Sequence, residues 1–177
     1  MDFFEVVNTR QSIRTFTAQP VEPAKLHQLW NAINRAPSAG NLQAYEVFAV
    51  TRRESLAALA AAATRPRTRG QDYITPGPIT LVFCANHARS SQRYLDRSQA
   101  LYCVQDATIA CAYAQLAATA LGLATVWIGA FDEEAVRKAI DVGSDLRPIA
   151  LLPIGYAAET PARSTRRPLD DLIHHVN

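Results

Sequence analysis

A long run without any charged residue, residues 107–131, is the feature that most constrains the fold of this chain. The run is long enough to cross a membrane, but it is rich in alanine, contains Gln115, and is interrupted by Gly122 and Gly129. A glycine is typical of the position just after a helix, where the backbone turns into the left-handed region. The run therefore predicts a buried helix over about 98–121, closed by Gly122, and a buried strand over 124–128, rather than a membrane span.

Composition and charge narrow the class of protein. The 177 residues are 49% hydrophobic and 19% charged, which is typical of one globular domain covering residues 1–177. A formal charge of +2 gives no reason to expect a nucleic-acid partner, and the basic segment 65–69 is interpreted as a solvated loop. The three cysteines show no metal-ligand spacing, and the N-terminus resembles no secretory signal, so we expect a cytoplasmic protein without a disulfide framework or bound metal.

Hydrophobic periodicity and breaker residues predict the remaining elements. The expected helices cover residues 2–8, 23–35, 51–63 and a segment after Asp132, and the expected strands cover residues 45–51, 79–84 and 148–156. Helices and strands mix without strict alternation, which favours an α+β domain in three layers over a doubly wound one.

Three consecutive acidic residues begin the helix after residue 131. Asp132 is a good N-terminal cap, and Glu133 and Glu134 complement the helix dipole and stand four residues before Arg137 and Lys138. Capping and ion pairing account for all three carboxylates, so we do not assign them to acid/base catalysis.

The segment Arg10-Gln11-Ser12-Ile13-Arg14 is a candidate anion-binding site. An arginine presents a planar fork of donors that fits phosphate, and a serine hydroxyl can donate a further hydrogen bond to the same oxygens. Taken alone, the segment is better explained as a solvated surface turn, because surface charge is the default for arginine.

Several common chemistries lack their sequence patterns here. The chain has no G-x-G-x-x-G, G-x-x-x-x-G-K-[ST], G-x-S-x-G or H-E-x-x-H motif, and its four histidines have no ligand spacing. We therefore predict no catalytic side chain and no metal ligand. The pairs Tyr94/Asp96 and Tyr102/Asp106 could face a pocket, although core packing and hydrogen bonding at helix ends are the alternative.

Four motifs, in order along the chain, resemble the FMN-dependent nitroreductase family. They are Arg10-Gln11-Ser12-Ile13-Arg14, Ala36-Pro37-Ser38-Ala39-Gly40-Asn41-Leu42-Gln43, the segment from Gly122-Leu123 through Val126-Trp127-Ile128-Gly129, and Arg166-Arg167-Pro168-Leu169. The resemblance implies a three-layer α/β/α sandwich with a mixed, mainly antiparallel sheet. It also implies an obligate homodimer with FMN at the subunit interface.

The resemblance assigns the phosphate of FMN to the two ends of the sequence. Arg10 and Ser12 would hold the phosphate and the ribityl chain, and Arg166 with Arg167 would close the phosphate site. Arg14 would approach the pyrimidine edge of the flavin, where a cation favours hydride acceptance at N5.

The remaining implied contacts are to the isoalloxazine ring. Pro37, Ser38 and Ala39 would contact it from the partner chain, with Asn41 and Gln43 nearby.

Ile128 and Gly129 would present backbone to the ring near N5. Gln11 and Ser164 depart from the family, since Gln11 falls where arginine or histidine is frequent and Ser164 where some members have lysine.

The implied activity is oxidoreduction in which NADH or NADPH gives hydride to the flavin and a nitroaromatic, quinone or similar small acceptor then takes the electrons. The alternatives are other flavin chemistry on the same scaffold, such as azoline dehydrogenation, dehalogenation or flavin fragmentation, or a flavin-binding module without catalysis. The chain is short for the family, so helical insertions that cover the flavin in larger members are expected to be absent.

Overall fold

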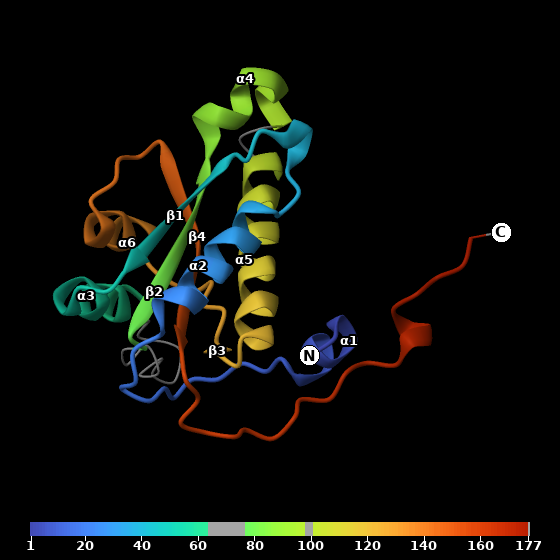
Figure 1. Cartoon of the computed structure of the whole chain (residues 1–177). Coiled ribbons are helices and arrows are strands. Elements are labelled where there is room, and N and C mark those ends of the chain that lie inside the picture. The colour runs from blue at the N-terminus through green and yellow to red at the C-terminus, as the bar shows by residue number, and fades with distance from the viewer. Residues whose placement is uncertain (64–76, 98–100, 177) are drawn as a thin grey trace.

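The computed structural model describes residues 1–63, 77–97 and 101–176, and the basic segment 65–69 lies outside these residues. The long helix α5 (Cys103–Ala120) and a four-stranded antiparallel sheet form the centre of the fold (Figure 1). This α+β architecture was predicted from the mixture of helical and strand patterns.

The sheet has the strand order β1-β2-β4-β3 and is built from β1 (Tyr45–Val50), β2 (Ile79–Asn86), β3 (Ala124–Thr125) and β4 (Leu146–Gly155). The apolar run predicted as a buried strand is β2, which pairs with β1 on one side and β4 on the other. All three ladders between these strands are antiparallel. In the described part of the chain, the parallel component expected of a mixed sheet is limited to one bridge, between Ser12 and Thr125.

Successive residues of β2 enter different hydrophobic clusters, because neighbouring side chains in a strand point to opposite faces of the sheet. Leu81 and Phe83 are fully buried against α2 (Pro23–Asn34) and α5. Val82 and Cys84 are fully buried against α3 (Arg53–Ala63) and α6 (Glu133–Ile140). The sheet is therefore covered by helices on both faces.

Helix α5 confirms the prediction made from the uncharged run. The buried alanines of this helix and Cys111 pack against α2 and the sheet. The last residue of the helix is Ala120, and Leu121 is its C-terminal cap. Gly122 follows with φ +74°, as expected of a glycine that closes a helix. No helix in residues 1–63, 77–97 and 101–176 is both long and apolar enough to cross a membrane.

Three elements differ from their predicted form. Helix α4 (His87–Arg97) was not predicted, and the long helix begins at Cys103 rather than near 98, with residues 98–100 outside the described part. Strand β3 contains only two residues, and beyond it Ile128 forms a separate bridge with Leu151.

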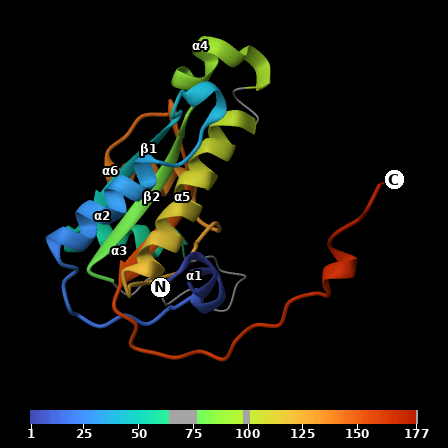
Figure 2. The ribbon, with the colours of Figure 1, turned by 45° about the vertical axis from the view of Figure 1, so that its right-hand side comes forward.

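The two ends of the chain lie together on one side of the molecule. Helix α1 (Phe3–Thr9) contacts α5, and the segment after β4 passes beneath it before extending away from the body (Figures 1 and 2). Several large apolar side chains are exposed here: Phe3, Phe4, Leu169, Leu172, Ile173 and Val176. The two ends therefore present a substantial apolar surface to the outside of this single chain.

Candidate functional site

The segment predicted to bind an anion lines a cavity of about 420 Å³, together with the C-terminal tail. Arg10, Gln11, Ser12 and Arg14 line one side, and residues 161–164 with Arg166 line the other. We call this the arginine cavity. Arg163 is a further lining arginine that was not assigned to the site from the sequence.

Backbone pairing fixes the N-terminal wall of the arginine cavity. The side chains of Asp2 and Glu5 each accept a hydrogen bond from the other residue's backbone N–H, so a complete capping box starts α1. After the helix ends, the backbone N–H of Ile13 donates to the Thr125 carbonyl at 3.0 Å. The arginine-bearing segment is therefore held beside β3.

The segment just before the C-terminal wall is hydrogen-bonded to the segment just after the N-terminal wall. The backbone N–H of Thr17 donates to the Tyr156 carbonyl at 2.9 Å, and that of Ala158 donates to the Thr15 carbonyl at 2.8 Å. Two segments separated by most of the sequence thus run side by side at the mouth of the cavity.

Glu159 ties these walls together and was not identified from the sequence. Its carboxylate accepts hydrogen bonds from the backbone N–H groups of Arg14 and Thr15. The bond from the Arg14 N–H is the main reason why the pKa of Glu159 lies below its ordinary value. Ionised Glu159 therefore fixes the backbone from which the Arg14 side chain projects.

A second cavity, of about 500 Å³, lies at the opposite end of α5 and is called here the loop cavity. Pro37, Ser38 and Ala39 line it from the loop after α2, and residues from 102 to 109 line it from α5 and the turn before it. Tyr102 and Asp106 are among the lining residues.

Asp106 is 2% exposed and holds the loop that borders this cavity. Its Oδ1 accepts from the backbone N–H of Ala39 at 2.9 Å, and its Oδ2 accepts from that of Ala44 at 3.3 Å. A buried carboxylate is tolerated where backbone donors compensate for lost hydration. Asp106 thus fixes both ends of the loop, as helix-end hydrogen bonding also predicted.

The loop itself has an unusual backbone conformation. Gly40, Asn41 and Gln43 all have positive φ angles, between 46° and 56°. The backbone N–H of Gln43 donates to Ser38 Oγ at 2.9 Å, and the side-chain NH₂ group of Gln43 donates to Asn41 Oδ1 at 2.9 Å. In this structure, Asn41 and Gln43 therefore stabilise the conformation of the loop through hydrogen bonds within it.

Five predicted site residues line neither cavity: Asn41, Gln43, Ile128, Gly129 and Arg167. Ile128 is buried and exchanges backbone hydrogen bonds of 3.0 Å with Leu151, and Gly129 follows it at an exposed position. Arg167 is exposed beside Arg166.

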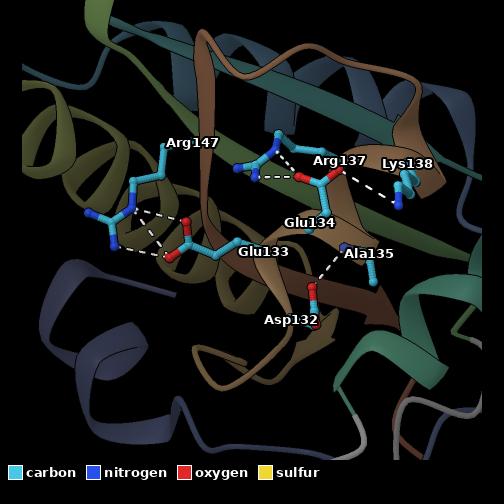
Figure 3. Close-up of polar contacts among 7 residues, drawn as sticks. All are labelled: Asp132, Glu133, Glu134, Ala135, Arg137, Lys138 and Arg147. Carbon is cyan, nitrogen blue, oxygen red and sulfur yellow. Dashed lines mark hydrogen bonds and ion pairs between the residues drawn. The ribbon is translucent and has the colours of Figure 1, made fainter.

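The three acidic residues at the start of α6 cap the helix or form ion pairs with arginine and lysine (Figure 3). Asp132 caps α6 by accepting from the Ala135 N–H at 2.9 Å, as predicted. Glu134 pairs with Arg137 at 2.6 Å and more distantly with Lys138 at 3.8 Å.

The expected pairing of Glu133 with Arg137 is not present. Glu133 instead binds Arg147 on β4 at 3.0 Å, because its side chain faces the sheet (Figure 3).

The described residues give no evidence for catalysis by a cysteine nucleophile or by a bound metal. Burial raises the pKa of Cys84 to about 12 and also raises the pKa values of Cys103 and Cys111, which keeps these thiols protonated at neutral pH. Residues 1–63, 77–97 and 101–176 contain no cluster of metal-ligating side chains.

Comparisons with known proteins agree on one family. The model of the family described as "Nitroreductase family" matches residues 7–156. An FMN reductase (NAD(P)H) of Bacillus subtilis is 30% identical to this chain over 93% of this chain and 69% of its own length. An oxygen-insensitive NADPH nitroreductase of Salmonella typhimurium is 29% identical over 96% of this chain and 72% of its own.

The fold agrees with solved structures of the same family. The crystal structure of a nitroreductase family protein from Clostridium novyi superposes with a TM-score of 0.81 at 28% identity, covering 93% of this chain and 89% of that one.

Proposed function

Because the chain belongs to the nitroreductase family, we propose that it is an FMN-dependent oxidoreductase that couples NAD(P)H oxidation to reduction of a nitroaromatic, quinone or similar small acceptor. FMN, when bound, would supply the hydride- and electron-transfer chemistry between NAD(P)H and the acceptor. The protein's part is to bind and orient the flavin and its substrates.

The observation that carries this proposal is the convergence of Arg10, Ser12 and Arg166 on one cavity. A phosphate monoester has a charge close to about −2 at neutral pH and several acceptor oxygens. Guanidinium groups and a hydroxyl are donors suited to that anion. The donor set therefore fits the phosphate end of FMN. Arg10 and Ser12 would bind the phosphate and ribityl chain, and Arg166 with Arg167 would complete the site.

The loop cavity supplies the second half of the proposed site. Pro37, Ser38 and Ala39 would contact the flavin ring from the partner chain, with Asn41 and Gln43 shaping the loop that presents them. The two cavities share no lining residue, so a flavin that needs both is best accommodated between two copies of the chain.

The apolar side chains exposed at both chain ends support an obligate homodimer, because they are available to be buried in an interface. Within each chain, the helices on both faces of the sheet would form the three-layer sandwich.

Other residues of the chain would adjust the flavin environment. Arg14 would lie at the pyrimidine edge, oriented through the backbone bond to Glu159, and Gln11 would line the same cavity. Ile128 and Gly129 would offer backbone near N5, where the absence of a side chain at Gly129 allows close approach. Hydride transfer itself requires no side-chain acid or base, which fits the lack of a catalytic side chain in this assignment.

The test is spectroscopic and kinetic. Purified protein, reconstituted with FMN, should show the visible absorption of bound oxidised flavin, lose it when NADH or NADPH is added without oxygen, and regain it with a nitroaromatic or quinone. Sustained turnover of NAD(P)H by the acceptor should follow. A protein that cannot be reconstituted with FMN, or whose bound flavin no nicotinamide reduces, would refute the proposal.

A matched pair of variants tests the phosphate assignment. Arg10→Gln should raise the dissociation constant for FMN by about 10- to 100-fold, since a hydrogen bond to a charged group contributes about 1.5–3 kcal/mol. Arg53→Gln, at an exposed position at the start of α3, removes the same charge elsewhere and should leave FMN binding unchanged.

A further inference from the structure

Helix α4 carries three arginines that the proposed function does not use. Arg89, Arg93 and Arg97 are spaced four residues apart, so they lie on one face of the helix. None of them forms an ion pair with a carboxylate of the described residues. Among the described ion pairs, this face therefore carries positive charge without a carboxylate partner.

Two of these guanidinium groups are held by aromatic rings. Arg93 Cζ lies 5.6 Å from the centroid of the Tyr94 ring, and Arg97 Cζ lies 5.3 Å from that of Tyr102. The two rings meet edge to face with centroids 4.9 Å apart. A guanidinium stacked on a ring is restrained in orientation, yet its N–H donors remain able to bind an anion.

The arginines contact residues that line or border the loop cavity, although none of them lines it directly. Tyr102 lines the cavity, and the Arg97 guanidinium lies over the ring of Tyr102. A Cβ added to Gly40 would lie 3.0 Å from Nη1 of Arg93, so Arg93 rests on the loop next to Ala39. Arg89 Nε donates to the Leu42 carbonyl and secures the helix against this loop.

The carboxylate in the same cavity does not neutralise these cations. Asp106 is almost fully buried, and its two oxygens accept hydrogen bonds from the backbone of Ala39 and Ala44. Its charge is thus directed into the loop, whereas Arg93 and Arg97 are exposed.

We propose that the loop cavity selects substrates that carry an anionic group, a carboxylate or a phosphate, and that Arg93 and Arg97 bind this group. The proposal rests on the proposed function, because it names the substrate class for the same site. Two sources share this chemistry: a carboxylate on the aromatic acceptor, and the 2′-phosphate that distinguishes NADPH from NADH.

The experiment compares matched substrate pairs in the FMN-loaded wild-type protein and in Arg93→Gln, Arg97→Gln and the double variant. One arm measures KM for 4-nitrobenzoate against neutral 4-nitrobenzamide, and the other measures KM for NADPH against NADH. We expect KM for the anionic member of one pair to rise about fivefold in each single variant and about 20-fold in the double variant, while KM for its neutral partner and kcat change little. A higher salt concentration should raise KM for the anionic substrate and leave KM for the neutral substrate unchanged.

The control variant Arg53→Gln removes a positive charge from α3, on the other face of the sheet, and should change neither ratio. A change confined to the nitrobenzoate ratio identifies the acceptor as the anion, and a change confined to the NADPH ratio identifies the 2′-phosphate. If the enzyme turns over and the double variant changes neither ratio, the proposal is wrong.

A binding measurement separates this proposal from the proposed function. Calorimetry with non-reducible 4-aminobenzoate and 4-aminobenzamide needs no turnover, and wild-type protein should bind the anion several-fold more tightly, with the difference lost in the double variant. A protein that holds no flavin but keeps this difference would refute only the proposed function. Equal binding of the two compounds by wild-type protein, with no difference in either KM ratio, would overturn the anion site.

Discussion

Replacing Asp106 with asparagine tests whether one buried carboxylate fixes the loop that borders the second cavity. The carboxylate offers one oxygen to the Ala39 N–H and the other to the Ala44 N–H, at 2.9 and 3.3 Å. Asparagine keeps one acceptor oxygen and replaces the other with an NH₂ group, which cannot accept a hydrogen bond. One backbone N–H therefore loses its partner, and Ala44 is fully buried, so water cannot replace it.

The expected decrease in the free energy of unfolding follows from that single unsatisfied donor. A buried N–H without a partner costs about 1–3 kcal/mol, so Asp106→Asn should lower the free energy of unfolding by about that amount. Asp106→Ala leaves both donors unsatisfied and should cost about 2–6 kcal/mol on the same basis. The two variants should therefore differ from each other as well as from the wild type.

Urea denaturation of the flavin-free protein measures these differences, and Asp145→Asn is the matched control because Asp145 is exposed. If the loop also contacts the flavin, both Asp106 variants should bind FMN more weakly than the control does. An Asp106→Asn protein with a free energy of unfolding within about 0.5 kcal/mol of the wild type would refute the assignment, since surface substitutions usually fall within that range.

Three further changes test the arginine cavity and the loop. At saturating FMN, Arg14→Ala should slow flavin reduction by NAD(P)H more than Arg10→Ala does in stopped-flow measurements; equal rates would contradict their separate roles. The lowered pKa of Glu159 means that its stabilising contribution is complete above the ordinary glutamate value and is lost as pH falls through the folded-state value. Glu159→Gln should therefore lower the Tm at neutral pH by more than it does at pH values well below the ordinary glutamate pKa of about 4.3, and an equal loss at both pH values would exclude this linkage. Gly40→Ala should cost about 1–2 kcal/mol in urea denaturation, because φ is +56° and the new Cβ would lie 2.6 Å from Tyr94 Oη; an unchanged midpoint would show that the loop relaxes freely.

Elements with strong local signals were predictable from the sequence. The apolar run in β2 and the alanine-rich run in α5 have patterns that only burial explains, and Gly122 marks the end of α5 with the backbone angle it adopts. Asp132 was likewise identified as a cap, because capping depends on residues within one turn.

Features set by tertiary contacts were not predictable. Helix α4 is highly polar and has almost no buried face, so hydrophobic periodicity gives no sign of it. Glu159 is a single carboxylate in a polar tail, and its partner Arg14 lies 145 residues away. Glu133 likewise has Arg137 as a near neighbour in sequence, but the packing of α6 on the sheet directs it to Arg147.

The candidate site was predicted through the resemblance of ordered motifs rather than through spacing. Composition alone left residues 10–14 as either an anion site or a surface turn. The resemblance had assigned Arg166 to the same site, and in the structure it lines the same cavity from the far end of the sequence, although no local pattern indicates this.

The pairing of residues 14–17 with residues 156–159 also bears on how the protein is made. Domains often begin to fold while the ribosome is still extending the chain, but the arginine cavity is lined by Arg166 as well as by Arg10. A nascent chain that has folded its sheet and helices still lacks one wall of this cavity until residues 161–166 emerge. If the cavity binds a phosphorylated ligand as proposed, that ligand should bind only after these residues have emerged from the ribosome.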